Sequence, residues 1–171
     1  MRTFAAAALL VLLAPAAARA QSPWDAAKKA AGQASTGKVE KEVNKRLLEE
    51  SRKNQCSFKS GTAELEKGCD AKATRLARAL IDAKKKLAAA GVTKNFKFVV
   101  SGHTDSTGSA EKNKELSGQR AAVMVKELVA RGVARDEIES VGMGSERPLV
   151  TPDDTPAKKA KNRRYEVQVK L

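Results

Sequence analysis

Residues 96–124 have the sequence FKFVVSGHTDSTGSAEKNKELSGQRAAVM, in which three kinds of segment follow one another. Phe96, Phe98 and Val100 alternate with other residues, which predicts a buried strand. The Gly, Thr, Asp and Ser residues after it predict a polar loop. Apolar residues then recur at helical spacing, at Leu116, Ala121, Met124, Val125 and Leu128. A strand, a loop and a helix are therefore expected in close succession.

Two opposite charges lie on either side of this loop. Asp105 is in the loop, and Arg120 is on the expected helix, nearly in line with Asn113 and Leu116. Helical side chains lean toward the N-terminus of their helix, so we expect Arg120 to turn back toward the end of the strand. Functional groups gather where strands end. The sequence thus predicts either a site between the two charges or a structural ion pair that braces the loop against the helix.

The N-terminus has the features of an export signal. Arg2 precedes an apolar run over residues 4–18, and residues 18–20 have the small-residue pattern of a cleavage site. The apolar run is shorter than the roughly 20 residues that a membrane-spanning helix needs. We therefore predict a signal peptide at residues 1–20, no transmembrane span, and a mature protein that is exported to the periplasm, with association with the outer membrane left open.

The chain is strongly basic, with a formal net charge of +13 over 171 residues. Removal of residues 1–20 takes away Arg2 and Arg19 and no acids, which lowers this charge to +11. Such a surplus favours association with polyanions, either anionic lipid headgroups or a carboxylate-rich cell wall. Export makes nucleic acid the least favoured partner.

Two cysteines, Cys56 and Cys69, are present. An exported protein meets an oxidising compartment, where such a pair usually joins. A disulfide around a loop of this size contributes about 3 kcal/mol on the chain-entropy estimate. We predict a structural disulfide.

Helical and strand patterns organise the rest of the chain. Residues 21–53 are expected to be a charged helical arm or linker, because residues 38–53 favour a helix whereas Gly32 to Gly37 interrupt its pattern. The sequence leaves open whether this arm packs on the domain, pairs with a copy of itself, contacts another envelope protein or acts as a spacer. Residues 54–171 are expected to be one domain, with strands, helices and a long polar loop in this order: strand 56–58, helix 70–90, strand 95–101, helix 111–131, strand 138–142, loop 143–161 and strand 165–171.

Several short motifs of this domain resemble one known family. The motifs are GHTDSTG at residues 102–108, Asn113, Leu116-Ser117 and Arg120-Ala121, and finally Asn162-Arg163-Arg164. Together they are similar to the OmpA-like peptidoglycan-binding domain, a family that includes the C-terminal domains of OmpA, Pal and MotB. The resemblance covers roughly residues 54–171. It implies an α+β fold of two layers, with the order β-α-β-α-β-β, a mixed four-stranded sheet, helices on one face, and the last strand antiparallel inside the sheet.

The resemblance also implies a ligand, the diaminopimelate residue of the peptidoglycan stem peptide. Asp105 is expected to take its ammonium group and Arg120 the carboxylate on the same carbon. A zwitterion needs opposite charges at a fixed separation, and the planar fork of arginine matches a carboxylate. Further candidate residues match family positions around the pocket: Thr107, Asn113 and Leu116, with Asn162 and Arg163 as secondary candidates.

Catalytic and metal sites have weaker support. Ser101, His103 and Asp105 have the residue types of a triad, but triad members normally come from separate segments. We expect His103 to hydrogen-bond the loop instead. One histidine without a supporting cluster does not suit a metal. The sequence therefore predicts a noncatalytic peptidoglycan binder without a cofactor. The alternative is a charge-driven binder of anionic envelope polymers or lipids with a vestigial pocket.

Overall fold

The computed structural model describes residues 23–171, and the expected signal peptide lies outside the described residues. A short 3-10 turn, Arg135–Glu137, precedes the second strand. The helices and strands follow in the order α1 (Pro23–Lys53), α2 (Asp70–Ala89), β1 (Lys97–His103), α3 (Ala110–Val129), β2 (Ile138–Gly142), α4 (Pro156–Asn162) and β3 (Arg164–Lys170).

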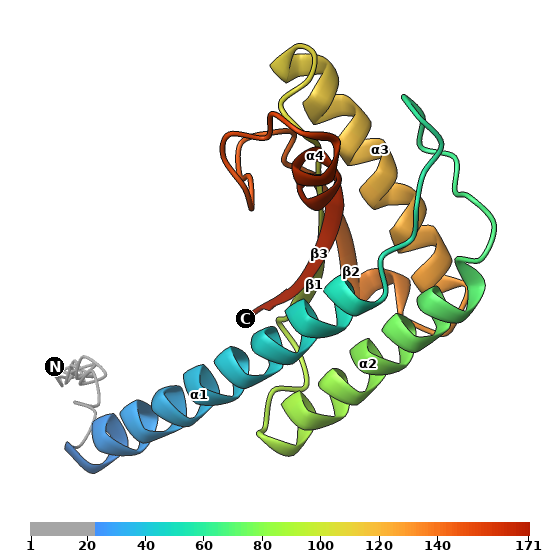
Figure 1. Cartoon of the computed structure of the whole chain (residues 1–171). Coiled ribbons are helices and arrows are strands. Elements are labelled where there is room, and N and C mark those ends of the chain that lie inside the picture. The colour runs from blue at the N-terminus through green and yellow to red at the C-terminus, as the bar shows by residue number, and fades with distance from the viewer. Residues whose placement is uncertain (1–22) are drawn as a thin grey trace, which may run out of the picture.

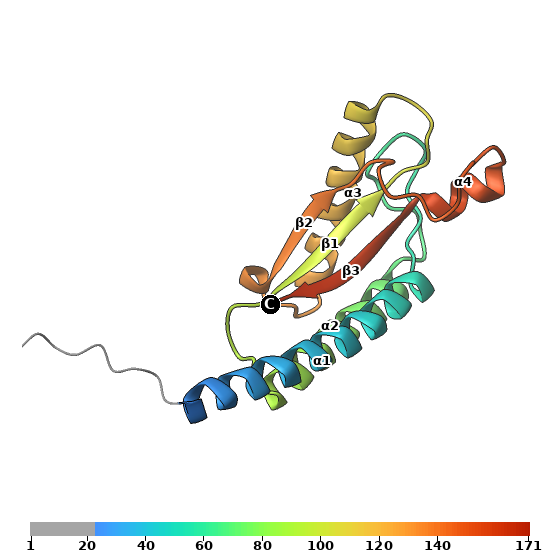
Figure 2. The ribbon, with the colours of Figure 1, turned by 90° about the vertical axis from the view of Figure 1, so that its left-hand side faces the viewer.

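The strands form one mixed sheet in the order β2-β1-β3. β1 is parallel to β2, with Phe98 opposite Ile138, and antiparallel to β3, with Phe98 opposite Val169. Helices α2 and α3 lie on one face of this sheet, α1 runs alongside β3 and contributes to the same core, and α4 lies at the end of the sheet (Figures 1 and 2). The expected α+β fold of two layers is therefore confirmed.

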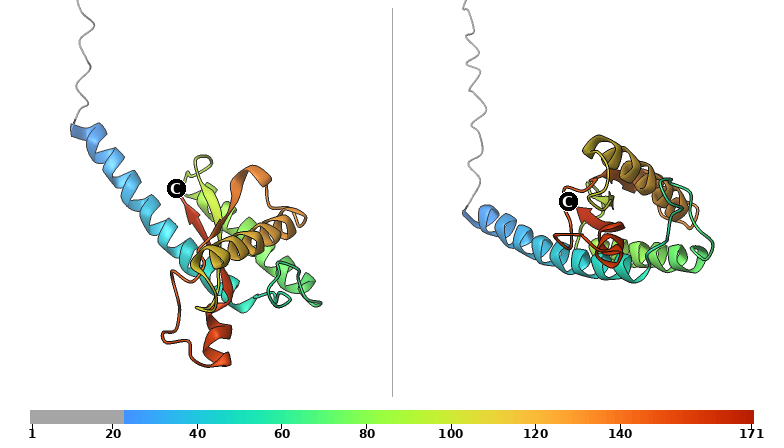
Figure 3. Two further views of the ribbon diagram at one scale, coloured as in Figure 1. Left: turned by 90° about the horizontal axis from the view of Figure 1, so that it is seen from above. Right: turned by 45° about the horizontal axis from the view of Figure 1, so that its top comes forward.

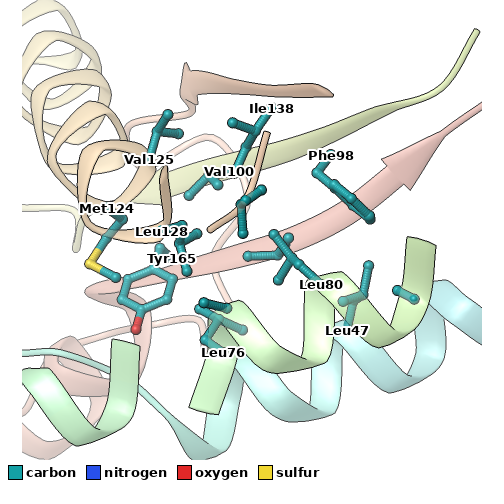
Figure 4. Close-up of a cluster of buried hydrophobic side chains, with 14 of the residues drawn as sticks. Leu47, Leu76, Leu80, Phe98, Val100, Met124, Val125, Leu128, Ile138 and Tyr165 are labelled. Carbon is teal, nitrogen blue, oxygen red and sulfur yellow. The ribbon is translucent and has the colours of Figure 1, made fainter. Parts of the chain in front are cut away.

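One apolar core joins the two layers. Figure 4 shows side chains of the sheet and the three helices pointing toward one another. Burial of each large side chain contributes about 1.5 to 3 kcal/mol. The most deeply buried include Leu47, Leu76, Leu80, Leu87, Phe98, Val100, Met124, Leu128 and Tyr165.

The expected fourth strand is wrong for the part of the chain that the structure describes. Phe58 forms only an isolated bridge with Leu65, inside a small turn closed by hydrogen bonds such as that from the Lys59 amide to the Glu64 carbonyl (2.9 Å). This segment does not pair with the sheet. Consequently β3 lies at the edge rather than inside the sheet.

The free edge of β3 is covered by amide side chains instead of a strand. Asn44 of α1 donates to the Val169 carbonyl (3.0 Å) and accepts from the Val169 amide (2.6 Å). Gln55, just after α1, bonds the Tyr165 carbonyl (2.7 Å) and amide (3.1 Å) in the same way. These side chains bond the backbone of two edge residues as a neighbouring strand would, and so they take over part of the role of a fourth strand at this edge.

Helix α1 differs from the expected arm in being continuous. It runs through Gly32 and Gly37, where an interruption was expected, and the hydroxyls of Ser35 and Thr36 donate to the Gly32 carbonyl (2.8 and 2.9 Å). Val43 and Leu47 are buried in the domain core. The C-terminal half thus packs on the domain, whereas the N-terminal part of the helix extends beyond it (Figure 3).

Two glycines let α3 lie directly against the ends of β1 and β2. A Cβ at Gly102 would collide with the Ser117 carbonyl, and one at Gly142 with the Lys114 carbonyl. Only glycine permits such a close approach of backbones. This contact fixes the start of α3 beside the loop that follows β1.

Candidate functional site

The loop after β1 presents a fixed carboxylate. Asp105 is 9% exposed, and its Oδ1 accepts a hydrogen bond from the Thr107 amide (3.0 Å). Its Oδ2 forms an ion pair with Arg163 Nη1 (2.7 Å). Burial raises the pKa of the Asp105 carboxyl, but the bonds from Arg163 and Thr107 outweigh it and hold the pKa below its ordinary value. Asp105 is therefore ionised at neutral pH.

Asn113 ties this loop to the first turns of α3. Its Nδ2 donates to the Thr107 carbonyl (3.0 Å) and more weakly to the Asp105 carbonyl (3.4 Å). The helix begins just before it, where the Ser109 hydroxyl accepts from the Lys112 amide (3.3 Å) as an N-cap. Asn113 therefore shapes the loop, and its position explains why the sequence has an amide there.

Arg120 is held by groups far away in the sequence. Its Nε donates to the Thr62 carbonyl (2.9 Å) and its Nη2 to the Lys59 carbonyl (3.4 Å), while the guanidinium lies over the Phe58 ring at 5.1 Å. The residue is only 9% exposed. Burial and the charge of Arg163 lower the pKa of Arg120, and the charge of Asp105 raises it.

Arg120 and Asp105 do not form the bracing ion pair that the sequence allowed. Arg120 takes part in none of the ion pairs between described residues, and the carboxylate of Asp105 faces Arg163 instead. Both charges nevertheless line one cleft of about 1000 Å³, which α3, the 55–66 segment and α4 enclose. The expected residues Thr107, Asn113 and Leu116 line the same cleft, and so does Arg163.

Asn162, the other secondary candidate, does not line this cleft. It is 1% exposed, and its side chain bonds the backbone of Leu149 and Val150 and the Asp153 carboxylate (2.8 to 3.1 Å). Asp153 in turn accepts from the amide and hydroxyl of Ser106 (2.9 and 2.5 Å). Asn162 thus fastens the long loop before α4 to the loop that carries Asp105.

The hydrogen bond expected from His103 to the loop is wrong within the described residues. Both ring nitrogens are buried without a hydrogen-bond partner there, and the nearest carboxylate oxygen, on Glu166, is 4.0 Å away. Burial, together with the charge of Arg164, lowers the pKa of His103 to about 4. The imidazole is therefore neutral at pH 7. No hydrogen bond joins His103 to Asp105 or Ser101 among the described residues, so the triad geometry is absent from this part of the chain.

The sequence did not indicate the groups that hold Arg120. The Lys59 and Thr62 carbonyls act through their backbone, so no residue type identifies them. The aromatic ring of Phe58 is the one residue-type signal among these groups, and the sequence pattern predicts a strand there. Cys56 and Cys69 are joined as a disulfide at the two ends of this segment, with a Cα–Cα distance of 5.1 Å.

Other kinds of site find no support in the described residues. None of their histidine, cysteine and acidic side chains gather into a group suited to a metal ion. The helices between residues 23 and 171 also include none with the length and apolar character needed to cross a membrane.

The fold and the cleft define a small α+β domain whose strand-end loops form a charged cleft. Residues 57–163 match the OmpA family, and the chain belongs to this family. No enzyme family is indicated.

Several relatives are similar over the same region. The peptidoglycan-binding protein ArfA of Mycobacterium tuberculosis is 48% identical over 73 residues, which is 43% of this chain and 22% of ArfA. The peptidoglycan-associated lipoprotein of Pseudomonas aeruginosa is 39% identical over 72 residues, 42% of each chain. The chain thus spans less than half the length of these curated relatives.

Solved structures share the fold. The peptidoglycan-associated lipoprotein of Burkholderia pseudomallei superposes with a TM-score of 0.54 at 23% identity, covering 68% of this chain and 89% of that one. The C-terminal domain of Helicobacter pylori MotB gives a TM-score of 0.54 at 24% identity and covers 68% and 84%. Identities this low support the fold alone.

Proposed function

We propose that this chain binds peptidoglycan noncovalently, through the diaminopimelate residue of the stem peptide. The observation that carries the proposal is one cleft with a buried carboxylate and a buried guanidinium that are not paired with each other. Two relatives of the same family are named for peptidoglycan, one as binding it and one as associated with it. Family membership and the charges of the cleft support the same conclusion.

In this mechanism Asp105 binds the ammonium group of diaminopimelate and Arg120 the carboxylate on the same carbon. The carbonyls of Lys59 and Thr62 already occupy two of the guanidinium nitrogens, so Arg120 is oriented before the ligand arrives. Each charge-assisted hydrogen bond contributes about 1.5 to 3 kcal/mol. A single site is then modest in strength, and the repeating polymer supplies retention. Thr107, Asn113 and Leu116 shape the pocket, and Arg163 lies at its entrance.

Export to the periplasm completes the proposal. The signal peptide at residues 1–20, the division into an arm at 21–53 and a domain at 54–171, and the disulfide all suit a protein that acts at the cell wall. Binding requires no chemistry on the ligand and no cofactor.

Sedimentation with purified sacculi tests the mechanism. Wild-type protein is expected to pellet with the sacculi and to be released by free diaminopimelate. Asp105→Asn and Arg120→Ala are expected to stay in the supernatant, whereas Arg78→Ala, which removes an exposed charge of α2 outside the cleft, is expected to pellet normally.

Salt dependence separates the charge-driven alternative from this mechanism. A polyanion binder would lose affinity steeply with salt and would be weakened as much by Arg78→Ala as by Arg120→Ala. Wall binding that survived both Asp105→Asn and Arg120→Ala would overturn the proposal.

A further inference from the structure

The charges of the cleft are unevenly distributed. Six cationic side chains and two acidic ones line it, so it has more positive charge than one zwitterion requires. The side formed by α4 and the start of β3 contributes four of the cations and no acid: Lys159, Lys161, Arg163 and Arg164. We call these four residues the α4 side of the cleft.

Only part of this positive charge is neutralised within the protein. Glu166 pairs through the same Oε1 atom with Arg164 (2.9 Å), whose side chain is 6% exposed, and with Arg52 (3.3 Å). Lys159 and Lys161 take part in none of the ion pairs formed between residues 23 and 171. An anion in the cleft would therefore meet two lysines that form no ion pair within the described part of the chain, although Lys159 also faces a second pocket that Asp153 and Asp154 line.

Arg163 pairs with Asp105, the same carboxylate that the ammonium group of the ligand would bind. Among the described residues, Asp105 is the one acid that pairs with Arg163. The Arg163 side chain is 45% exposed. The Oδ1 atom of Asp105 already accepts from the Thr107 amide, so an ammonium group that binds Oδ2 would compete with the guanidinium for that atom. Such a ligand would free a third cation beside Lys159 and Lys161 as it brings its own carboxylates into the cleft.

Buried polar atoms at the same cleft also have unused hydrogen-bonding capacity. The Thr104 hydroxyl and both nitrogens of His103 have no partner among the described residues, and these side chains are 5% and 3% exposed. Both residues line the cleft. Unsatisfied buried polar groups are rare and call for an explanation, and a polar ligand atom or a bridging water supplies one.

We propose that the α4 side of the cleft binds a second carboxylate of the wall peptide, through Lys159, Lys161 and the Arg163 guanidinium released from Asp105. This inference rests on the proposed function. It adds a requirement that the zwitterionic head alone does not impose, namely a free carboxylate elsewhere on the same stem peptide.

Two carboxylates of a stem peptide fit this requirement. One is at the other end of diaminopimelate, and it is free when that residue ends the peptide. The other is the α-carboxylate of the glutamate residue, which is linked through its γ-carboxyl group. Amidation removes either charge and keeps nearly the same shape.

Calorimetric titration with four synthetic tripeptides tests the proposal. They carry both carboxylates free, one or the other amidated, or both amidated. We expect amidation of the recognised carboxylate to weaken wild-type binding about threefold to tenfold, as for ion pairs that are partly exposed. The amidated peptide that shows this loss of affinity identifies which carboxylate is bound.

Matched variants then locate the effect. Lys159→Gln with Lys161→Gln is expected to weaken the free peptide and to remove most of the difference between free and amidated peptides. Lys94→Gln with Lys126→Gln removes two exposed lysines outside the cleft and is expected to preserve that difference.

The outcomes separate this inference from the proposed function. Equal wild-type affinity for all four tripeptides would overturn the second site and leave diaminopimelate binding intact. An equal loss of discrimination in both double variants would also overturn it, because the overall charge would then explain the preference. Failure of the wild type to bind any tripeptide would remove both proposals.

Discussion

Two arginines flank Asp105, and the protein holds them in opposite ways. Arg120 is 9% exposed and fixed by two backbone carbonyls and the Phe58 ring. The side chain of Arg163 is 45% exposed and is held by its ion pair with Asp105. One guanidinium is oriented by groups that no ligand removes, and the other by the group that the ligand needs.

Arg120 is thus pre-organised for a ligand, whereas Arg163 must exchange its partner Asp105 for a group of the ligand. A donor that is already oriented loses little side-chain entropy when it binds, which favours affinity. A donor that must leave a carboxylate gives up an existing interaction, so its net contribution depends on what replaces that interaction. We therefore expect Arg120 to supply most of the affinity for the ligand. The α4 side of the cleft, which includes Arg163, is expected to supply selectivity between free and amidated peptides.

The largest expected effect is on the free energy of unfolding, and it comes from disturbing the packing of α3, the helix that carries Arg120, against β1. Gly102→Ala would place a methyl group against the Ser117 carbonyl and push α3, which carries Arg120, away from β1. Overpacking of this severity is expected to lower the free energy of unfolding by about 3 kcal/mol or more. Urea denaturation measures it. Gly37→Ala, in a helix with no neighbouring atom within 4 Å, is the control and should not destabilise.

The disulfide is expected to have the next largest effect. Cys56→Ser with Cys69→Ser opens the segment that holds Arg120, and the loss of chain constraint is expected to lower the free energy of unfolding by about 3 kcal/mol. At a temperature where the variant is still folded, its affinity for diaminopimelate should fall as well. Unchanged affinity would show that the 59–62 carbonyls keep their place without the bridge.

How far the sequence determines these features depends on the range of the interactions. Periodicity located α2, α3, β1 and β3 because each pattern reports which face of that element is buried, whereas β2 was predicted only from its short apolar run. The prediction of a fourth strand was wrong because the edge of β3 is bonded by the side chains of Asn44 and Gln55, and a one-dimensional pattern does not report such long-range pairings.

The site was predicted in part for the same physical reason. Asp105 and Arg120 were found because a loop and the helix after it are neighbours in sequence. The pairing of Asp105 with Arg163 and the backbone contacts of Arg120 join residues 58 to 61 positions apart, and carbonyl groups have no residue signature. Their ligand role stays a prediction.

His103 provides the third effect, on stability rather than on binding. Its pKa is about 4 in the folded state, lowered by burial and by Arg164 and Arg147 against an opposing effect of Glu166. The unfolded chain takes up the proton near pH 6.5, so stability is complete above that pH and falls as the pH decreases toward 4. Between pH 7.5 and pH 5 the expected loss is about 2 kcal/mol.

Denaturation across this pH range checks the expectation cleanly, because the chain has one histidine. His103→Gln is expected to flatten the profile between pH 7.5 and pH 5. A wild-type profile that is already flat would show that the imidazole is solvated or partnered in solution.

A smaller effect, on diaminopimelate affinity, shows how much the planar shape of the Arg120 guanidinium contributes beyond its charge. Arg120→Lys keeps the charge and loses the planar fork, and a lysine cannot bond two loop carbonyls and a ligand carboxylate in the same geometry. We expect diaminopimelate affinity to fall about tenfold, as for the loss of one charge-assisted hydrogen bond. Calorimetry measures it, with Arg78→Lys as the control on an exposed face.

Arg163→Gln is expected to change peptide affinity the least, but the direction of that change is expected to differ between a free and an amidated peptide. With a peptide whose second carboxylate is amidated, the variant no longer has a guanidinium competing for Asp105, so its affinity should equal or exceed that of the wild type. With the free carboxylate, the lost contact should outweigh this relief and weaken binding about threefold. A reversal of sign between the two peptides is the signature of an exchanging arginine. If Arg163→Gln weakened both peptides equally, Arg163 would be a fixed support like Arg120, and the contrast between the two sides of the cleft would be wrong.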